Sequence, residues 1–592
     1  MSAPRILSKA TLPIGKTVRR RGPRTEVLTD KLCDDILSYV GPLLAKHKGC
    51  DILDGNPGAG LWSSKIHEFL KPRRHVLIEE DEAYMPLLRP YLDAPGSTYV
   101  HAPYDGGRPA GFARTLDEGY LPDQQALSKD DPRLNQPNNT LLVMANLTRS
   151  YISSKVNSEL YKRHNVHALT TAAFTHSLFH QYGLIRMLLW VDEGVKDAMI
   201  PRSLAMNAYT MGFNWAANAN IVADTSPDRL GRGSPDAGGV DVDFASAVQT
   251  ARKMQWSGMK LPPGRSWEYH EKAWEMSTRL EHSEQPESLH HLLPEVTTRD
   301  TLAKDELQEL ELAYASGNLG RFLGQPTNGG SVQPRNIDPR FIRMLYLQKM
   351  EKFYQARRSR GSKPNEKYIA HLRLTRRMFE TDFRLRSGKA SNEEYMAATK
   401  AMHQMGEDCI AIEKSSMIPS SARMFRLARD NRNAYYVDPP FLMWDRRQYE
   451  PLKILKDELR ATDGAALLDV QPKPPSRTIT ADELAYWKKF VELLYTRPSS
   501  TIKAALEHMA AGSSEVVLER VPSLSDLSRG GSLNPGMLSV RALSPELLDD
   551  VVQAYRSWIF RPDHVEKKLI TKDLDWDDLI FTMAGVELPR RS

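Results

Sequence analysis

Two features in the first quarter of the chain have the residue types and spacing to hold a nucleoside. A glycine-rich turn at residues 54–60 follows a short apolar stretch and precedes a helical pattern. Its glycines allow a sharp bend and a close approach to a ligand, and the amides of the following helix face the same place. Glu79, nineteen residues after Gly60, is spaced to accept hydrogen bonds from both ribose hydroxyls. The candidate cofactor-binding residues are Asp54, Gly55, Asn56, Gly58, Gly60 and Glu79.

These residues need a scaffold that brings two strand ends together, and the surrounding pattern predicts one. Short apolar strands alternate with helical stretches, which is typical of an open parallel α/β sheet. A helix capped by Thr29 or Asp30 comes first and is interrupted at Gly41–Pro42. Residues 103–140 are rich in Pro, Gly, Asp and Asn and are predicted to be a surface insertion. The predicted strands are 50–54, 75–79, 98–101, 140–145, 185–191 and 219–223, with helices at 62–70 and 81–92.

Four motifs together resemble the rRNA adenine dimethyltransferase family, in particular its mitochondrial transcription factor B branch of the fungal type. Residues 54–63 resemble the first cofactor motif of that family, and residues 78–81 resemble the second. Residues 146–149, Asn-Leu-Thr-Arg, lie where the family carries Asn-Leu-Pro-Tyr. Residues 438–445 resemble the proline-marked last strand of the family's core. The resemblance implies a class I methyltransferase (Rossmann-like) sheet and S-adenosylmethionine as the cofactor.

Departures from the family's motifs point away from catalysis. Asn146 stands at the family-equivalent catalytic position, but Thr148 replaces the proline and Arg149 replaces the aromatic residue that stacks on the flipped base. Tyr151 lies two residues out of register. Residues 98–103 lack the acid that binds the cofactor's adenine, and Asp105 is out of position. We therefore expect impaired or lost methylation and weak or vestigial binding of S-adenosylmethionine.

The resemblance and the composition predict five regions. The penultimate core strand ends near residue 223 and its expected partner begins near residue 435, so a folded insertion with its own core separates them. In chain order the regions are a basic N-terminal arm or targeting segment at 1–29, a Rossmann-like core at 30–225, a mostly helical insertion at 226–434, a returning core strand at 435–455, and a helical C-terminal domain at 456–592.

One stretch of the insertion, residues 340–389, is strongly basic. It holds fifteen basic and four acidic side chains, interleaved with aromatic residues and broken at residues 361–364. Two helices presenting arginines to phosphates would give this pattern, but so would a solvated helical hairpin whose aromatics form its core. The candidate nucleic-acid contacts are Arg357, Arg358, Arg360, Arg376 and Arg377.

Composition excludes several classes of protein. Hydrophobic residues are 41% and charged residues 26%, as in ordinary globular chains. No apolar run approaches the roughly 20 residues of a membrane span, so membrane insertion is not expected. Three cysteines are too few for a disulfide scaffold, and no Cys/His cluster suggests a metal. Residues 1–25 carry seven basic and no acidic side chains, which suits either mitochondrial targeting or a disordered basic arm.

Three functions therefore stay open. The first is a monomeric mitochondrial matrix transcription initiation factor that binds the mitochondrial RNA polymerase and promoter DNA. The second is an S-adenosylmethionine-dependent mitochondrial rRNA adenine N6-dimethyltransferase. The third is a non-catalytic RNA-binding protein of mitoribosome assembly. The Gly turn, Glu79 and Asn146 favour the second, whereas Thr148 and Arg149 oppose it.

Overall fold

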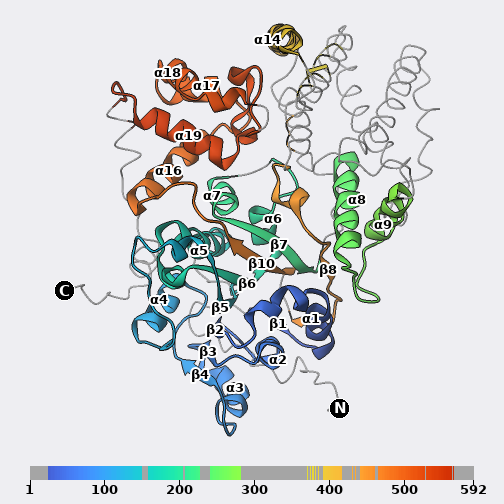
Figure 1. The fold of residues 1–592 in the computed structure, drawn as a ribbon, viewed down its shortest axis with the longest axis vertical. Helices are drawn as coiled ribbons and strands as arrows, with labels where there is room; N and C mark the ends of the chain where they lie inside the picture. Colours follow the sequence, from blue (N-terminus) through green and yellow to red (C-terminus); the bar gives the residue numbers. More distant parts are fainter. Residues whose placement is uncertain are drawn as a thin grey trace. The chain divides into compact units, whose positions relative to one another are not determined.

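The computed structural model divides the chain into two compact units (Figure 1). The first comprises Met1–Pro227, Ser257–Ser266 and Ala434–Ser592, and the second comprises Asp228–Trp256 and Trp267–Asn433. Apart from a few single residues, the structure describes residues 24–149, 158–204, 207–226, 240–281, 391–416, 440–460, 464–526 and 529–562.

The first unit is an α/β structure built on a mixed sheet. Within the described residues, eight strands lie in the order β4-β3-β2-β5-β6-β10-β7-β8. Only β10 in this set runs antiparallel to its neighbours, β6 and β7. The central strands are buried along almost their whole length, as expected where helices cover both faces. The strands are β2 Asp51–Gly55, β3 Arg74–Ile78, β4 Tyr99–Ala102, β5 Pro137–Asn146, β6 Leu184–Asp192, β7 Ala217–Asp224, β8 Leu452–Lys453 and β10 Ala465–Pro472.

Side-chain alternation along the strands assigns helices to the two faces of the sheet. Val143 of β5 and Met187 of β6 point into a core that also contains Phe112, Val166 and Phe213. That face carries α4 Pro109–Asp117, α5 Ser158–Thr171, α6 Glu193–Met199 and α7 Ala208–Ala216. The opposite face carries α1 Asp30–Leu44, α2 Leu61–Leu70 and α3 Met85–Leu92. All six strands predicted before residue 225 are confirmed, to within a few residues at their ends.

Two local predictions in this region are wrong. The first helix is not interrupted at Gly41–Pro42 but continues to Leu44. Gly41 serves packing there, since a Cβ at this position would lie 3.0 Å from the ring of Phe69 on α2. Residues 103–140 are not merely a surface insertion, because they contain α4, whose Phe112 is fully buried in the core.

The returning strand is not where the sequence predicted it. Met443–Arg446 forms a short 3-10 helix, and the Sδ atom of Met443 accepts a hydrogen bond from the Ala219 amide at 3.1 Å. Within the described part of residues 435–455, only the two-residue strand β8 joins the sheet, parallel to β7. The strand that pairs antiparallel with β7 is β10, so Thr225 and Ala465, 240 residues apart, are hydrogen-bonded neighbours. Proline favours this outcome, because Pro440 has no N–H to donate inside a central strand.

The region 456–592 was expected to be helical, yet β9 Leu459–Arg460 and β10 come first. Helices then follow, and Trp487 stacks on Trp215 of α7 with ring centroids 4.6 Å apart. They are α16 Ala481–Leu494, α17 Ile502–Met509, α18 Ser513–Arg520 and α19 Pro545–Arg556. The short strand β9 pairs antiparallel with β1, Glu26–Val27.

The described helices of the second unit are α8 Val240–Ser257, α9 Glu268–Glu281 and α14 Asn392–Ser416. Ala247 and Val248 of α8 form a small core with Ala273 of α9. Between α8 and α9, the loop Ser257–Ser266 belongs to the first unit, where buried Arg265 pairs with Asp35 at 2.7 Å. Among the described helices, none has the length and apolarity needed to span a membrane.

Candidate functional site

The candidate site lies where the order in which the chain adds strands to the sheet reverses, between β2 and β5. From β2 the chain moves outward to β3 and β4 on one side, and from β5 it moves to β6 on the other. Ligands of open α/β sheets bind beside the carboxyl ends of the strands at such a point. The glycine turn follows β2, Glu79 follows β3, and Asn146 ends β5. The structure therefore brings the predicted turn, acid and amide together at one edge.

The glycine turn has the backbone that its residue types require. Gly58 and Gly60 have φ angles of 61° and 77°, in the region that disfavours other side chains. A Cβ on Gly55 would lie 2.2 Å from the carbonyl oxygen of Gly106, so this glycine permits the loop after β4 to cross the turn. Gly60 immediately precedes α2, so the first amides of that helix point toward the crevice.

Asp54 is turned inward. Its Oδ2 accepts a hydrogen bond from the Ser63 hydroxyl and lies 3.3 Å from Nε2 of His75. The residue is 3% exposed. This carboxylate therefore braces the turn against α2 and β3.

Glu79 is already occupied by the chain itself. Arg24 donates from Nη2 to Oε2 of Glu79 at 2.6 Å, and the Asp81 amide donates to Oε1 at 3.0 Å. The guanidinium also lies 3.9 Å from the ring centroid of Tyr84. Burial lowers the pKa of Arg24, but Glu79 and Glu26 outweigh it and hold that pKa above the usual value. The carboxylate predicted to bind a ribose is thus neutralised and covered.

Glu26 fills the position beside the glycine turn. Its Oε2 accepts from the Ala59 amide at 3.2 Å, and its Oε1 accepts from Nε of Arg24 at 3.0 Å. A Cβ on Gly58 would lie 2.3 Å from the same carboxylate. An anion bound at this turn would have to take the place of the Glu26 side chain.

The backbone of Thr25 binds the side of the crevice that the end of β5 forms. Its N–H donates to Oγ1 of Thr148 at 2.8 Å, and its carbonyl accepts from Nδ2 of Asn146 at 2.7 Å. Oδ1 of Asn146 accepts from the Thr148 hydroxyl at 2.7 Å. Asn146, the residue expected to hold the target base, is therefore engaged with a peptide group.

Arg149 closes the crevice from the other side. Its Nη2 lies 2.6 Å from Oδ2 of Asp81, and its Nη1 lies 3.6 Å from Oε1 of Glu80. Because Arg149 follows β5 and Asp81 follows β3, this ion pair spans the end of the intervening β2. The position where the family stacks an aromatic ring on a base holds a buried, paired cation.

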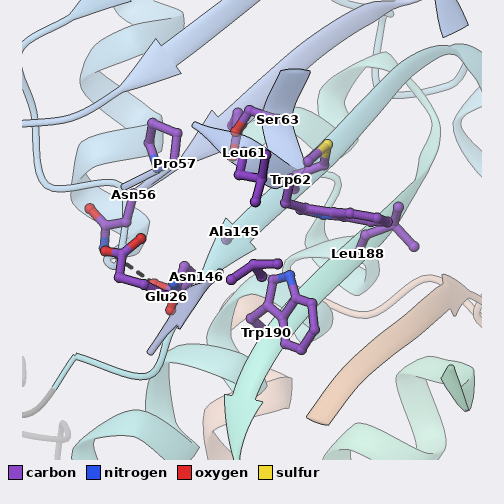
Figure 2. Close-up of a pocket in the computed structure, with 13 residues that line it drawn as sticks. Glu26, Asn56, Pro57, Leu61, Trp62, Ser63, Ala145, Asn146, Leu188 and Trp190 are labelled. Carbon is purple, nitrogen blue, oxygen red and sulfur yellow. Dashed lines mark hydrogen bonds between the residues drawn. The ribbon is translucent and has the colours of Figure 1, made fainter. Parts of the chain in front are cut away.

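A small cavity remains under these contacts (Figure 2). It measures about 20 Å³, which is room for about one water molecule and not for a nucleoside. Trp62 and Trp190 line it edge to face at 6.3 Å, and among the described residues their indole N–H groups have no hydrogen-bond partner. Asn56 donates from Nδ2 to the Asn146 carbonyl across the cavity mouth at 3.3 Å.

Each of the remaining candidate residues binds groups of its own loop, is exposed at a helical position or lies outside the described part of the chain. Oδ1 of Asp105 accepts from the Gly107 amide, and Oδ2 lies 3.0 Å from Nε of Arg108. Tyr151 lies outside the described residues. Of the five candidate nucleic-acid contacts only Arg377, exposed at a helical position, is described. The other four, Arg357, Arg358, Arg360 and Arg376, lie outside the described residues.

Sequence reasoning missed the segment at residues 24–28. It was assigned to a basic arm ending at residue 29, whereas Arg24 and Glu26 are buried in the first unit. Two weak signals mark the boundary. Leu28 directly precedes the Thr29 cap, as an apolar residue at N′ does in a hydrophobic staple, and Glu26 is the first acid after seven basic residues.

Comparisons with known proteins do not assign the site. No model of a known protein family matches the chain, and a search of curated proteins finds no match either. The described residues contain no group of three His, Cys, Asp or Glu side chains arranged to hold a metal ion.

Proposed function

We propose that this chain is a mitochondrial transcription initiation factor that binds the mitochondrial RNA polymerase and promoter DNA on a methyltransferase-derived fold, without methylating nucleic acid. The observation that carries the proposal is the filled crevice, in which Arg24, Thr25 and Glu26 contact the residues expected to hold cofactor and base. The methyltransferase origin is supported by the resemblance of the motifs and by the antiparallel pairing of β7 with β10. A hairpin of the last two strands is what the resemblance implies.

Loss of chemistry follows from the positions that methyl transfer needs. The reaction depends on holding an amine against a methyl donor, so positioning dominates the rate. Glu79 has both oxygens engaged, and Oδ1 of Asn146 accepts from the Thr148 hydroxyl rather than from the amine of a base. Since a fold does not determine function, a chain with a closed pocket would act through its surfaces.

Promoter opening calls for a basic surface and aromatic side chains that stack on unpaired bases. The sequence offers both at residues 340–389, and further positive charge at residues 1–23. The mitochondrial matrix location belongs to the same proposal, on the basic composition of the N-terminal segment. We propose the monomeric state with it.

A pull-down tests the proposal directly. The tagged full chain should retain the mitochondrial RNA polymerase and raise promoter-dependent transcription by that polymerase. Replacing Arg357, Arg358, Arg360, Arg376 and Arg377 with Glu should weaken promoter binding and flatten its salt dependence. Lys31→Glu, at an exposed position of α1, is the control for a single charge reversal outside this stretch. Capture of small-subunit rRNA without polymerase would replace this proposal with a role in mitoribosome assembly.

A second candidate is an rRNA adenine N6-dimethyltransferase, favoured by one observation. Asp54, Glu79 and Asn146 all remain at the crevice edge, where such an enzyme would use them. Methyl transfer from S-adenosylmethionine to an rRNA hairpin by the full chain would establish it. Asn146→Ala should then abolish that transfer.

A further inference from the structure

We infer that the crevice is a docking site for the chain's own residues 24–28, and that this docked segment and an adenosine ligand exclude each other. The inference goes beyond the proposed function, because it concerns what the crevice binds and not which polymerase or nucleic acid the surfaces contact. It assigns a peptide ligand to the edge of the sheet where the glycine turn and Glu79 predicted a nucleoside.

Consecutive residues of the segment reach three different strand ends. Arg24 contacts Glu79 after β3, the Thr25 peptide contacts Asn146 and Thr148 at the end of β5, and Glu26 contacts Ala59 in the turn after β2. Val27 then pairs with Leu459 in a two-residue ladder, and the Leu28 amide donates to the Glu458 carbonyl at 2.9 Å. A segment that merely crossed the surface would not be expected to make polar contacts with three different strand ends through three consecutive residues.

The polar contacts of the segment replace those that a nucleoside with an anionic tail, and the target base beside it, would make. The Arg24 guanidinium donates to Glu79 in place of ribose hydroxyls, and the Glu26 carboxylate accepts from the turn in place of the tail. The Thr25 peptide offers Thr148 and Asn146 one donor and one acceptor, as the edge of a base does. Occupancy of these positions leaves the cavity of about 20 Å³.

The walls of the crevice keep partners of their own when the segment is taken away. Oε1 of Glu79 still accepts from the Asp81 amide, and Oδ1 of Asn146 still accepts from Thr148. The turn remains braced by Asp54 against Ser63. The adenosine site is therefore latent, since undocking residues 24–26 uncovers it without dismantling it.

Calorimetry with S-adenosylhomocysteine tests the exclusion on the full chain. We expect no binding at millimolar ligand by the natural sequence or by the control Lys31→Ala, which alters an exposed pair on α1. Arg24→Ala/Glu26→Ala should bind at least tenfold more tightly than the natural sequence. Hydrogen exchange at the amides of residues 25–28 should accelerate in the double variant and not in the control.

Two results would overturn the inference. One is binding of S-adenosylhomocysteine to the natural sequence as tight as to the double variant. The other is accelerated exchange of residues 25–28 in the double variant without any ligand binding. If circular dichroism shows the double variant unfolded, Arg24→Gln/Glu26→Gln removes both charges of the segment at similar side-chain size and leaves every crevice wall intact; the same expected and overturning results apply to it. Polymerase retention by these variants reports separately on the proposed function.

Discussion

Two buried arginine–carboxylate pairs in the first unit have the same chemistry but different settings. Arg186 of β6 binds Asp469 of β10 with two hydrogen bonds of 2.7 and 2.6 Å, and its Nη1 donates to the Leu43 carbonyl. Arg24 binds Glu79 at 2.6 Å. All four side chains are nearly inaccessible to solvent, with exposures of 5% or less. Burial and hydrogen-bond distance alone would predict the same contribution to stability for the two pairs.

What distinguishes them is the element that carries each arginine. Arg186 and Asp469 lie on adjacent strands of the sheet, so neither can leave without opening the sheet between β6 and β10. Arg24 precedes a strand of only two residues, β1, and lies where a ligand would bind. A buried ion pair is therefore structural when both partners belong to the sheet, and replaceable when one belongs to a short segment over a crevice.

The largest expected effect is at the sheet pair. Arg186→Ala leaves the Asp469 carboxylate buried without its counter-charge, and should lower the free energy of unfolding by about 3–5 kcal/mol. Urea denaturation followed by circular dichroism measures it. The matched control is Arg186→Met/Asp469→Leu, which removes both charges and should be close to neutral, because well-packed apolar residues can replace a buried pair. A loss of under about 1 kcal/mol for Arg186→Ala would contradict the distinction.

The pair in the crevice should be less costly to break. In Arg24→Ala, segment 24–28 can undock and admit water to Glu79, so the loss should be about 1–3 kcal/mol. Glu79→Gln, which leaves Arg24 with only the Glu26 carboxylate, should give a similar loss and similar fast exchange of the Thr25 amide. A global loss as large as that of Arg186→Ala would mean that the segment is part of the core.

The difference between the two pairs also explains what could be predicted from the sequence. Most of the strands from β2 to β7 contain a short apolar run, and helical stretches separate them, so local patterning was sufficient to find them. Within β10 the polar Asp469 interrupts the apolar run, and only its partner Arg186, 283 residues earlier, explains its presence. Such a pairing has no local signal. The proline-marked residues 438–445, which precede β10, were predicted to form this strand instead.

The candidate site divides in the same way. The glycine turn, Glu79 and Asn146 were found because spacing along the chain fixes their place at the ends of strands. That they are covered could not be predicted, because Arg24 reaches Glu79 across 55 residues and Thr25 reaches Thr148 across 123. The replacement of the aromatic residue by Arg149 did indicate a changed crevice. It did not indicate that Asp81 would hold that arginine.

A buried polar group of the core that lacks a charged partner gives a smaller, pH-dependent effect. Burial lowers the pKa of His180 to about 4, and its nitrogens are fixed by the Leu169 carbonyl and the Ile185 amide. Below pH 6.5 His180 becomes protonated in the unfolded chain but stays neutral in the folded chain. The free energy of unfolding therefore falls as pH falls toward 4. Between pH 6 and 5 this residue should account for a loss of about 1 kcal/mol.

Urea titrations at several pH values measure that slope. His180→Gln should flatten it between pH 6 and 5, whereas His508→Gln, at an exposed position of α17, should leave it unchanged. A slope that is the same in both variants would mean that His180 is not the group that resists protonation.

The smallest effect is expected where the sequence departs most visibly from the methyltransferase motif. Arg149→Tyr with Thr148→Pro restores the Asn-Leu-Pro-Tyr pattern and removes the ion pair with Asp81. The Asp81 side chain is 20% exposed, so water can solvate the carboxylate that is left and stability should change by only about 1 kcal/mol. The double variant also removes the hydroxyl that accepts from Thr25, but Arg24 still covers Glu79 and Glu26 still fills the turn. Methyl transfer to an rRNA hairpin should therefore stay undetectable, and polymerase-dependent transcription should be unchanged. Turnover by this double variant would show that residues 146–149, and not the docked segment, prevent methyl transfer in the natural sequence. Turnover that arises only when Arg24→Ala/Glu26→Ala is added would show the reverse.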